Sequence, residues 1–357
     1  MPSTRLAGLS RNWAIAVLAI TVLALLCLGA ISLTQHDAPF DPTKTGDLHM
    51  YANVVDGVRR GGDFYDTLRA QLVAGHYGMK SVFNWRTPLF MSLTALMPSN
   101  LGMYALVLLT ALVGGGLAVW LTCRELGLIA GSSLVAVEIL GLGTALVPGT
   151  FLISELPTGF LILLSATAYG LGGRRTGFAA GALALFVREL AAPYVVICAF
   201  LAWRAGRRRE LALWGVVLAA YVAYYLWHVH MVGLHQRPDD LGDNAGWVQF
   251  GGAAFVLKAA AFNGYFTVAP LWETAILLPL ACIGLMAWPG PAGERIALTV
   301  FAYLALFAVV GKDVNSYWGA LFAPLMILGL VWSPAGLRDL WRAAFRRRED
   351  TLAVAAG

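Results

Sequence analysis

Charged residues are scarce in this chain. Asp, Glu, Lys and Arg make up 13% of its 357 residues, whereas about 25% is usual in soluble domains. Hydrophobic residues make up 59%, and the mean hydropathy is +0.70. Since so few polar side chains could not cover a soluble core of this size, the composition indicates an integral membrane protein.

Cysteine is also scarce, and we expect no cleavable leader. The four cysteines, Cys27, Cys123, Cys198 and Cys282, all lie inside apolar runs, which argues against a disulfide framework. The first apolar run, Trp13 to Leu33, is long enough to span a bilayer, and no small-residue cleavage site closes it. We therefore expect a retained transmembrane helix.

The net charge of +5 comes from arginines in short gaps between apolar runs and near the C-terminus. This placement is the positive-inside pattern that orients membrane helices, so we expect no nucleic-acid partner and two cytoplasmic termini. It predicts an all-α polytopic membrane protein with about eight full spans, near residues 13–33, 101–122, 127–147, 154–171, 211–232, 267–288, 296–310 and 317–333.

Residues 177–203 interrupt this order, because the arginine-rich segments before and after them both belong on the cytoplasmic side. These 27 residues would form about 40 Å of helix, enough for two half-length helices but not for two spans. We predict a re-entrant hairpin of two short helices, broken around residues 187–193, with Arg188 and Glu189 at its tip. One long tilted helix with Arg188 and Glu189 as an internal pair is the alternative.

The longest polar segment, residues 34–100, is predicted to be a non-cytoplasmic first loop. Its stretch "DLHMYANVVDGV" has apolar residues at helical spacing, which predicts an amphipathic helix in the membrane interface. A second interfacial stretch follows in "FYDTLRAQLVAGHYG". The expected organisation is one membrane domain over residues 1–337 and a basic cytoplasmic tail over residues 338–357.

The order of these features resembles the GT-C superfamily of integral-membrane glycosyltransferases. The resemblance rests on "GDLHMY" after the first helix, the "FYD" run, "NWRTPLF", "FLISELPTG", the short-helix pair "GALALFVRELAAPYVV" and the late "GKDVNSYWGALFAPL". Such enzymes take a sugar from a polyprenyl-phosphate donor on the non-cytoplasmic face, here that of a bacterial inner membrane. The resemblance implies a lipid or glycan acceptor, an aspartate base in the first loop, an assisting acid in the second and basic residues on the carrier phosphate.

Two acidic residues are the predicted catalytic groups. Asp47 follows the first span closely and is the candidate general base, in an inverting transfer. Its alternative role is that of an N-cap bonded to the amides of Met50 or Tyr51. Glu155, where many relatives have Asp, is the candidate assisting acid, and its alternative role is to complement a helix dipole.

Cationic and tyrosine side chains are the predicted donor-binding groups: Arg86, Arg188, Lys312, Tyr51 and Tyr65. Arginine presents a planar fork that matches phosphate oxygens, and lysine a compact charge. Arg188 is the strongest of these candidates, because charge inside an apolar run marks function. Arg86 could instead snorkel beside Trp85, and Lys312 could pair with Asp313.

No dedicated metal site is expected, because His228, His230 and His235 do not share a helix face. Carboxylates beside a sugar phosphate can recruit Mg²⁺ or Mn²⁺, so a divalent cation stays an open hypothesis.

Two other functions compete with glycosyl transfer. A lipid or sugar transporter or flippase would explain charges inside the membrane, but such proteins show paired halves with matching broken helices, and the halves here differ. An O-antigen ligase or polymerase would, by resemblance, concentrate arginines in a large later loop. Residues 233–266 hold only Arg237 and Lys258 as basic residues.

Overall fold

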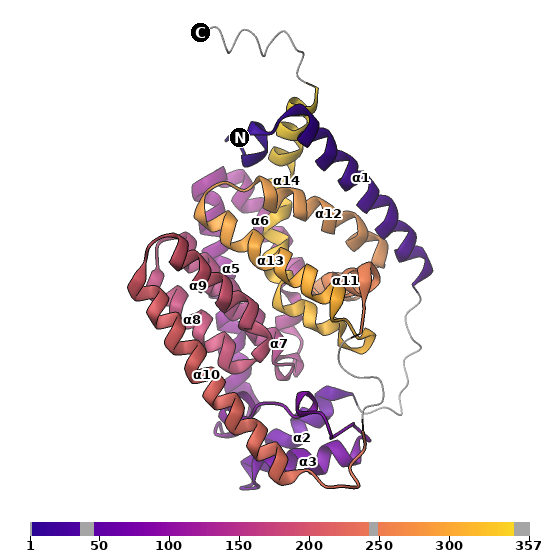
Figure 1. Cartoon of the computed structure of the whole chain (residues 1–357), viewed down its shortest axis with the longest axis vertical. Coiled ribbons are helices and arrows are strands. Elements are labelled where there is room, and N and C mark those ends of the chain that lie inside the picture. Colours follow the sequence, from indigo (N-terminus) through magenta and orange to yellow (C-terminus); the bar gives the residue numbers. More distant parts are fainter. Residues whose placement is uncertain (1, 36–45, 243–248, 346–357) are drawn as a thin grey trace.

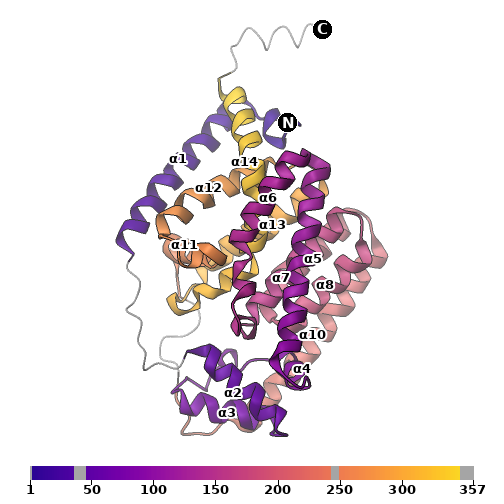
Figure 2. The same ribbon diagram turned by 180° about the vertical axis from the view of Figure 1, so that it is seen from behind.

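The computed structural model describes residues 2–35, 46–242 and 249–345, and this part of the chain is built from α-helices and 3₁₀ turns without a β-strand. Helices α2 (Asp47–Arg59) and α3 (Phe64–Ala74) of the first loop lie at one end of the elongated molecule (Figure 1). The start of α1 (Arg11–Thr34) and the end of α14 (Ala323–Ala344) lie at the other end. The view from behind shows the same separation (Figure 2). The first loop is therefore remote from both termini.

Within the described ranges, four helices are long and apolar enough to cross a membrane: α1 (Arg11–Thr34), α5 (Asn100–Leu126), α10 (Arg208–His235) and α13 (Gly290–Val309). A fifth candidate is a pair bent by 66°, η7 (Asp313–Leu321) with α14 (Ala323–Ala344). The predicted total of about eight spans is not confirmed. The helices at three other predicted spans contain fewer than 18 residues: α6 (Leu128–Gly141), α7 (Glu155–Gly170) and α12 (Leu271–Ala287).

The structure shows where apolar runs of the sequence do not form one long helix. The apolar run after α6 continues as the 3₁₀ turns η3 (Gly143–Leu146) and η4 (Thr150–Leu152), and the first part of the predicted last span is 3₁₀ rather than α-helical. In addition, α11 (Gly252–Ala261) forms a buried helix where the sequence predicted a loop. Helix α14 continues past the predicted domain boundary at residue 337, and residues 346–357 of the predicted tail lie outside the described residues.

The predicted break near residue 188 is present. Helix α8 (Arg174–Val187) ends there, Arg188 is extended, and α9 (Ala192–Arg204) begins after the short turn η5 (Glu189–Ala191). Arg174 and Arg204, at the outer ends of the two helices, line one cavity. The chain therefore returns to the side from which it came, which contradicts the single tilted helix.

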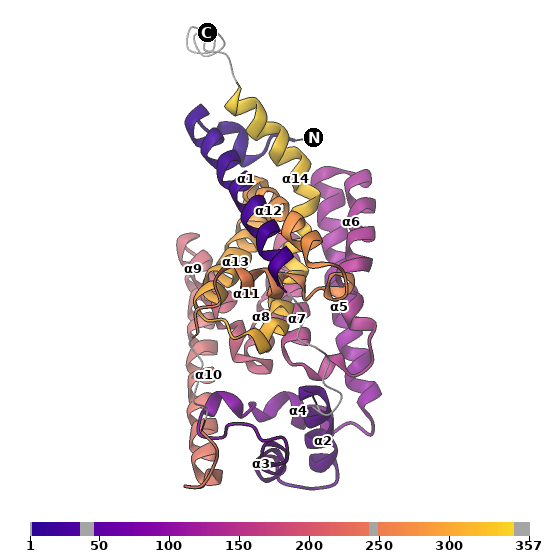
Figure 3. The same cartoon turned by 90° about the vertical axis from the view of Figure 1, so that its right-hand side faces the viewer.

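The first loop folds into α2 (Asp47–Arg59), α3 (Phe64–Ala74) and α4 (Pro88–Ala95). Tyr51, Val54 and Val55 on the apolar face of α2 are at most 2% exposed, because α3 and α4 pack against this helix. The prediction that this face lies in the membrane interface is therefore wrong for these residues. Helix α10 runs past the core to this end of the molecule (Figure 3), where Arg69 Nε of α3 donates to the His235 carbonyl at 2.9 Å.

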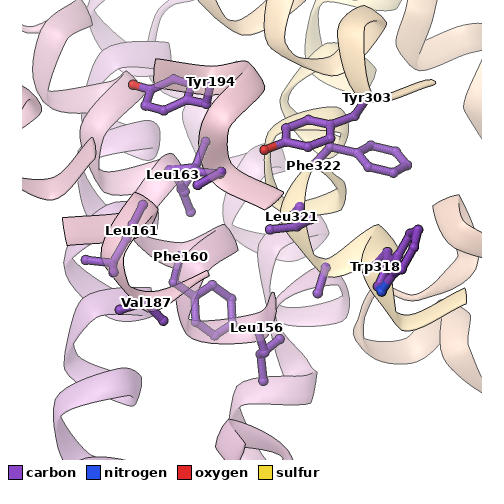
Figure 4. Close-up of a cluster of buried hydrophobic side chains, with 14 of the residues drawn as sticks. Leu156, Phe160, Leu161, Leu163, Val187, Tyr194, Tyr303, Trp318, Leu321 and Phe322 are labelled. Atoms are coloured by element: carbon purple, nitrogen blue, oxygen red, sulfur yellow. The ribbon is translucent and has the colours of Figure 1, made fainter. Parts of the chain in front are cut away.

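Close contacts between backbones fix the segments around the core. A Cβ atom on Gly159 of α7 would lie 1.9 Å from the Ala320 carbonyl oxygen, and one on Gly319 would lie 1.7 Å from that of Ala259. Segment η7 is thereby held between α7 and α11, with Phe160 of α7 facing the same apolar cluster as Leu321 (Figure 4). Such small-residue contacts are typical of helices packed in membranes.

Candidate functional site

A cavity of about 720 Å³ with charged and apolar lining residues lies between α2, the segment from His76 to Arg86, and η7. Four of the seven predicted site residues line it: Asp47, Tyr51, Arg86 and Lys312. These residues are far apart in sequence, and the fold of the first loop against η7 brings them together. The cavity is thus the candidate active site.

Asp47 begins α2 but does not cap it. The N-cap residue is Gly46, and no side-chain capping bond forms at this end, so the predicted N-cap alternative is wrong. The Tyr77 hydroxyl donates to Asp47 Oδ1 at 2.6 Å, and the Tyr317 hydroxyl lies 3.5 Å from Oδ2. The carboxylate is therefore oriented by phenols while it faces the cavity.

Tyr77 stays a hydrogen-bond donor to this carboxylate. Burial, and after it the hydrogen bond to Asp47, raises the pKa of Tyr77 above its ordinary value. A neutral phenol can hold a carboxylate in place without adding charge to the site.

Arg86 is the cation at the centre of the site, with 7% of its surface exposed. Its Nε atom donates to the Tyr51 hydroxyl oxygen at 2.8 Å and Nη2 donates to the Tyr317 hydroxyl oxygen at 3.1 Å. The Nη1 atom lies 3.5 Å from Glu155 Oε1 and makes no hydrogen bond within the described part of the chain. Arg86 therefore does not snorkel to a surface, and it retains hydrogen-bonding capacity.

Glu155 and Arg188 lie behind Arg86, outside the cavity lining. Glu155 is fully buried at the start of α7, and Arg188 Nε donates to its Oε1 atom at 2.8 Å. Arg188 Nη1 also pairs with Glu189 Oε1 at 2.5 Å. Because Glu155 is shared by two arginines, its position suits the orientation of Arg86 rather than contact with a substrate.

The last wall of the cavity comes from η7. Lys312, Asn315 and Tyr317 line it, while Asp313 pairs with Lys258 of α11 at 2.9 Å. The sequence did not identify Tyr77, Asn315 or Tyr317 as site residues. Tyr317 lies within the late stretch "NSYWG", but neither tyrosine has a local pattern that distinguishes it from other tyrosines in the chain.

Tyr65 lies apart from the cavity. Its hydroxyl contacts His228 Nδ1 at 2.9 Å, and the other ring nitrogen of His228 lies 3.2 Å from the Trp85 carbonyl oxygen. His228 is thus a buried histidine with both ring nitrogens in contact with groups inside the protein.

Asp47 is the carboxylate that lines the cavity among the residues described. A divalent cation bound with a sugar phosphate would find this one acidic ligand there. Asp63, Asp66 and His235 lie within 4.8 Å of one another elsewhere, but Asp63 already accepts the amides of Tyr65 and Asp66 as the cap of α3.

No protein-family model, curated protein or solved structure matches this chain.

Proposed function

We propose that the protein is an inverting membrane glycosyltransferase that moves a sugar from a polyprenyl-phosphate donor to a lipid or glycan acceptor on the non-cytoplasmic face. The observation that carries this proposal is the presence of the Asp47 carboxylate and the Arg86 guanidinium in one cavity. The donor class rests on the resemblance of the sequence motifs to the GT-C superfamily.

The reaction needs a base on one side of the sugar and cations on the other. Asp47 takes the proton of the acceptor hydroxyl, whose oxygen forms a bond to the anomeric carbon. The bond from that carbon to the phosphate oxygen breaks, and its electron pair leaves with the lipid phosphate. Base catalysis of this kind contributes about 10²–10⁴-fold, and preorganised charges commonly contribute more.

The side chains around the cavity support these roles. Tyr77 donates a hydrogen bond to one oxygen of Asp47 at 2.6 Å, which fixes the orientation of the carboxylate. Arg86 and Lys312 provide the positive charge for the leaving phosphate, and Glu155 holds Arg86 from behind at 3.5 Å. The base and the cations are thus supplied by separate elements.

A second cavity supports an amphiphilic substrate. It has a volume of about 670 Å³ and shares Val314 with the cavity that holds Asp47. Apolar residues of the segment 261–272 line it together with polar groups, among them Ser32, Gln35 and Asp313. Phe262, Phe266 and Trp272 belong to this lining. A lipid chain in this groove would leave its phosphate near Lys312.

The test is to incubate the purified protein with a panel of radiolabelled polyprenyl-phosphate sugars and membrane extract, and to identify the product. We expect one donor to lose its label to an acceptor, with inversion at the anomeric carbon. A parallel reaction with EDTA tests dependence on a divalent cation. Label that crosses proteoliposome membranes unchanged, without a new glycoside, would contradict the proposal and indicate a transporter.

A further inference from the structure

A third cavity, which is strongly charged, lies far from the candidate active site, between the starts of α8 and α10. It has a volume of about 520 Å³ and is lined by five arginines, Arg174, Arg175, Arg207, Arg208 and Arg209, together with Glu210. This gives a local charge of +4, from five cations and one anion. The starts of both helices add partial positive charge at the same place.

Four of the five arginines of this cavity differ from neighbouring arginines because they have no protein partner among the described residues. Arg204 pairs with Glu294, and Arg5 donates to the Gly290 carbonyl at 2.6 Å. Within the cavity, Arg207 pairs with Glu210 at 2.9 Å. The side chains of the remaining four are exposed and make no ion pair or hydrogen bond with any residue of the ranges described, namely Arg174, Arg175, Arg208 and Arg209.

The charged lining continues into an apolar surface. Phe178 and Leu213 also line the cavity, and the Phe178 ring packs at a tilt of 55° against Trp214, with ring centroids 4.5 Å apart. Along α10, Leu213 is 51% exposed and Val216 is 65% exposed, and this helix is one of the candidate spans. The positive-inside rule accounts for arginines at this end. It does not account for the exposed apolar helix face beside the unpaired guanidiniums. The two features together match an amphiphilic anion.

We propose that this cavity binds an anionic glycerophospholipid, with phosphate on the arginines and acyl chains along α10. Basic pockets between membrane helices recognise such headgroups, and arginine matches two phosphate oxygens at once. Because four unpaired guanidiniums exceed what one phosphate can bind, the site should prefer a lipid with two phosphates, of the diphosphatidylglycerol type, over phosphatidylglycerol. This site is independent of the proposed sugar transfer.

The test is native mass spectrometry of the detergent-purified full chain, titrated with diphosphatidylglycerol, phosphatidylglycerol or phosphatidylcholine. We expect that order of affinity, and we expect the Arg175→Gln/Arg208→Gln pair to weaken binding of the two-phosphate lipid by about 30-fold. The control pair is Arg60→Gln/Arg342→Gln, which removes the same charge from exposed arginines outside this cavity. An equal loss of affinity in the two double variants would overturn the proposal. So would binding of phosphatidylcholine as tight as that of diphosphatidylglycerol.

Two further arms keep the test decisive. Inorganic pyrophosphate that displaces the lipid completely at equal concentration would show a site for free phosphate instead of a lipid. If the glutamine pair does not give monodisperse protein, Arg175→Lys/Arg208→Lys keeps the charge and the topology signal but removes the fork. The affinity for diphosphatidylglycerol should then fall toward the affinity for phosphatidylglycerol. An unchanged ratio of the two affinities would contradict the proposed site.

Discussion

Arg86 connects the cavity with a buried row of charges. Starting from the cavity, carboxylates and guanidiniums alternate through Asp47, Arg86, Glu155, Arg188 and Glu189, with Tyr317 between the first two. Each buried charge therefore has an opposite neighbour, which offsets part of the cost of its desolvation. Removing a central member leaves uncompensated charge inside the protein.

Glu155→Gln is expected to destabilise the fold. The change removes the anion shared by Arg86 and Arg188, and breaking a buried pair in this way costs about 3–5 kcal/mol. The measurement is the free energy of unfolding from a denaturant titration in mild detergent. The control is Glu273→Gln, since Glu273 also lies in the first turn of a helix but is only partly buried. A loss of unfolding free energy no larger than that of the control would show that Glu155 does not stabilise the buried charges.

At the scale of elements, η7 decides the geometry of the site. It carries Lys312 at its start and Asn315 and Tyr317 within it. Gly159 and Gly319 allow α7 and α11 to approach its backbone. A shift of this segment would move Tyr317 away from both Asp47 and Arg86.

Gly159→Ala is expected to cause such a shift. The added methyl group would meet the Ala320 carbonyl oxygen at 1.9 Å, so one backbone must move, at a cost of about 1–3 kcal/mol for overpacking. Both the melting temperature in detergent and the donor affinity should fall. Gly116→Ala on α5 is the control, because its Cβ atom would meet nothing within 4 Å. Wild-type donor affinity in Gly159→Ala would show that the position of η7 does not govern the site.

Local patterns in the sequence predict some of these elements but not others. The charged residues Arg188 and Glu189 mark a true helix end, because chain conformation there follows from a few neighbouring residues. The 3₁₀ form of η7 and the role of Tyr77 depend on contacts with distant segments, which periodicity does not contain. For the same reason, the sequence indicated that Glu155 belongs to the site, but it did not reveal that Glu155 lies behind Arg86.

One end of the molecule carries arginine-rich turns, and the other end carries the first loop and the candidate active site. At the arginine-rich end, Arg11 Nε donates to the Ala344 carbonyl at 3.2 Å, and the turns before α8, α10 and α13 meet around shared cavities. The first loop and the candidate active site lie away from these turns (Figure 1). The proposed orientation places the arginine-rich end in the cytoplasm.

Labelling of single introduced cysteines tests this orientation. Ala70 on α3 and Ala205 beside α9 are both exposed, so Ala70→Cys should react with an impermeant thiol reagent in intact cells, and Ala205→Cys only after lysis. The unmodified chain, with its four native cysteines, gives the background. Reaction of Ala205→Cys in intact cells would reverse the proposed topology.

The most direct test of the proposed transfer is the turnover of Asp47→Asn with saturating donor in detergent. The amide oxygen can still accept the Tyr77 hydroxyl, and Arg86 and Lys312 are unchanged, so folding and donor binding should persist. Turnover should fall by about two to four orders of magnitude, because the proton acceptor is lost. Asp56→Asn, at an exposed carboxylate paired with Arg59, should leave turnover near that of the wild type. Turnover of Asp47→Asn within a few-fold of wild type would contradict the role of Asp47 as the base and with it the proposed mechanism.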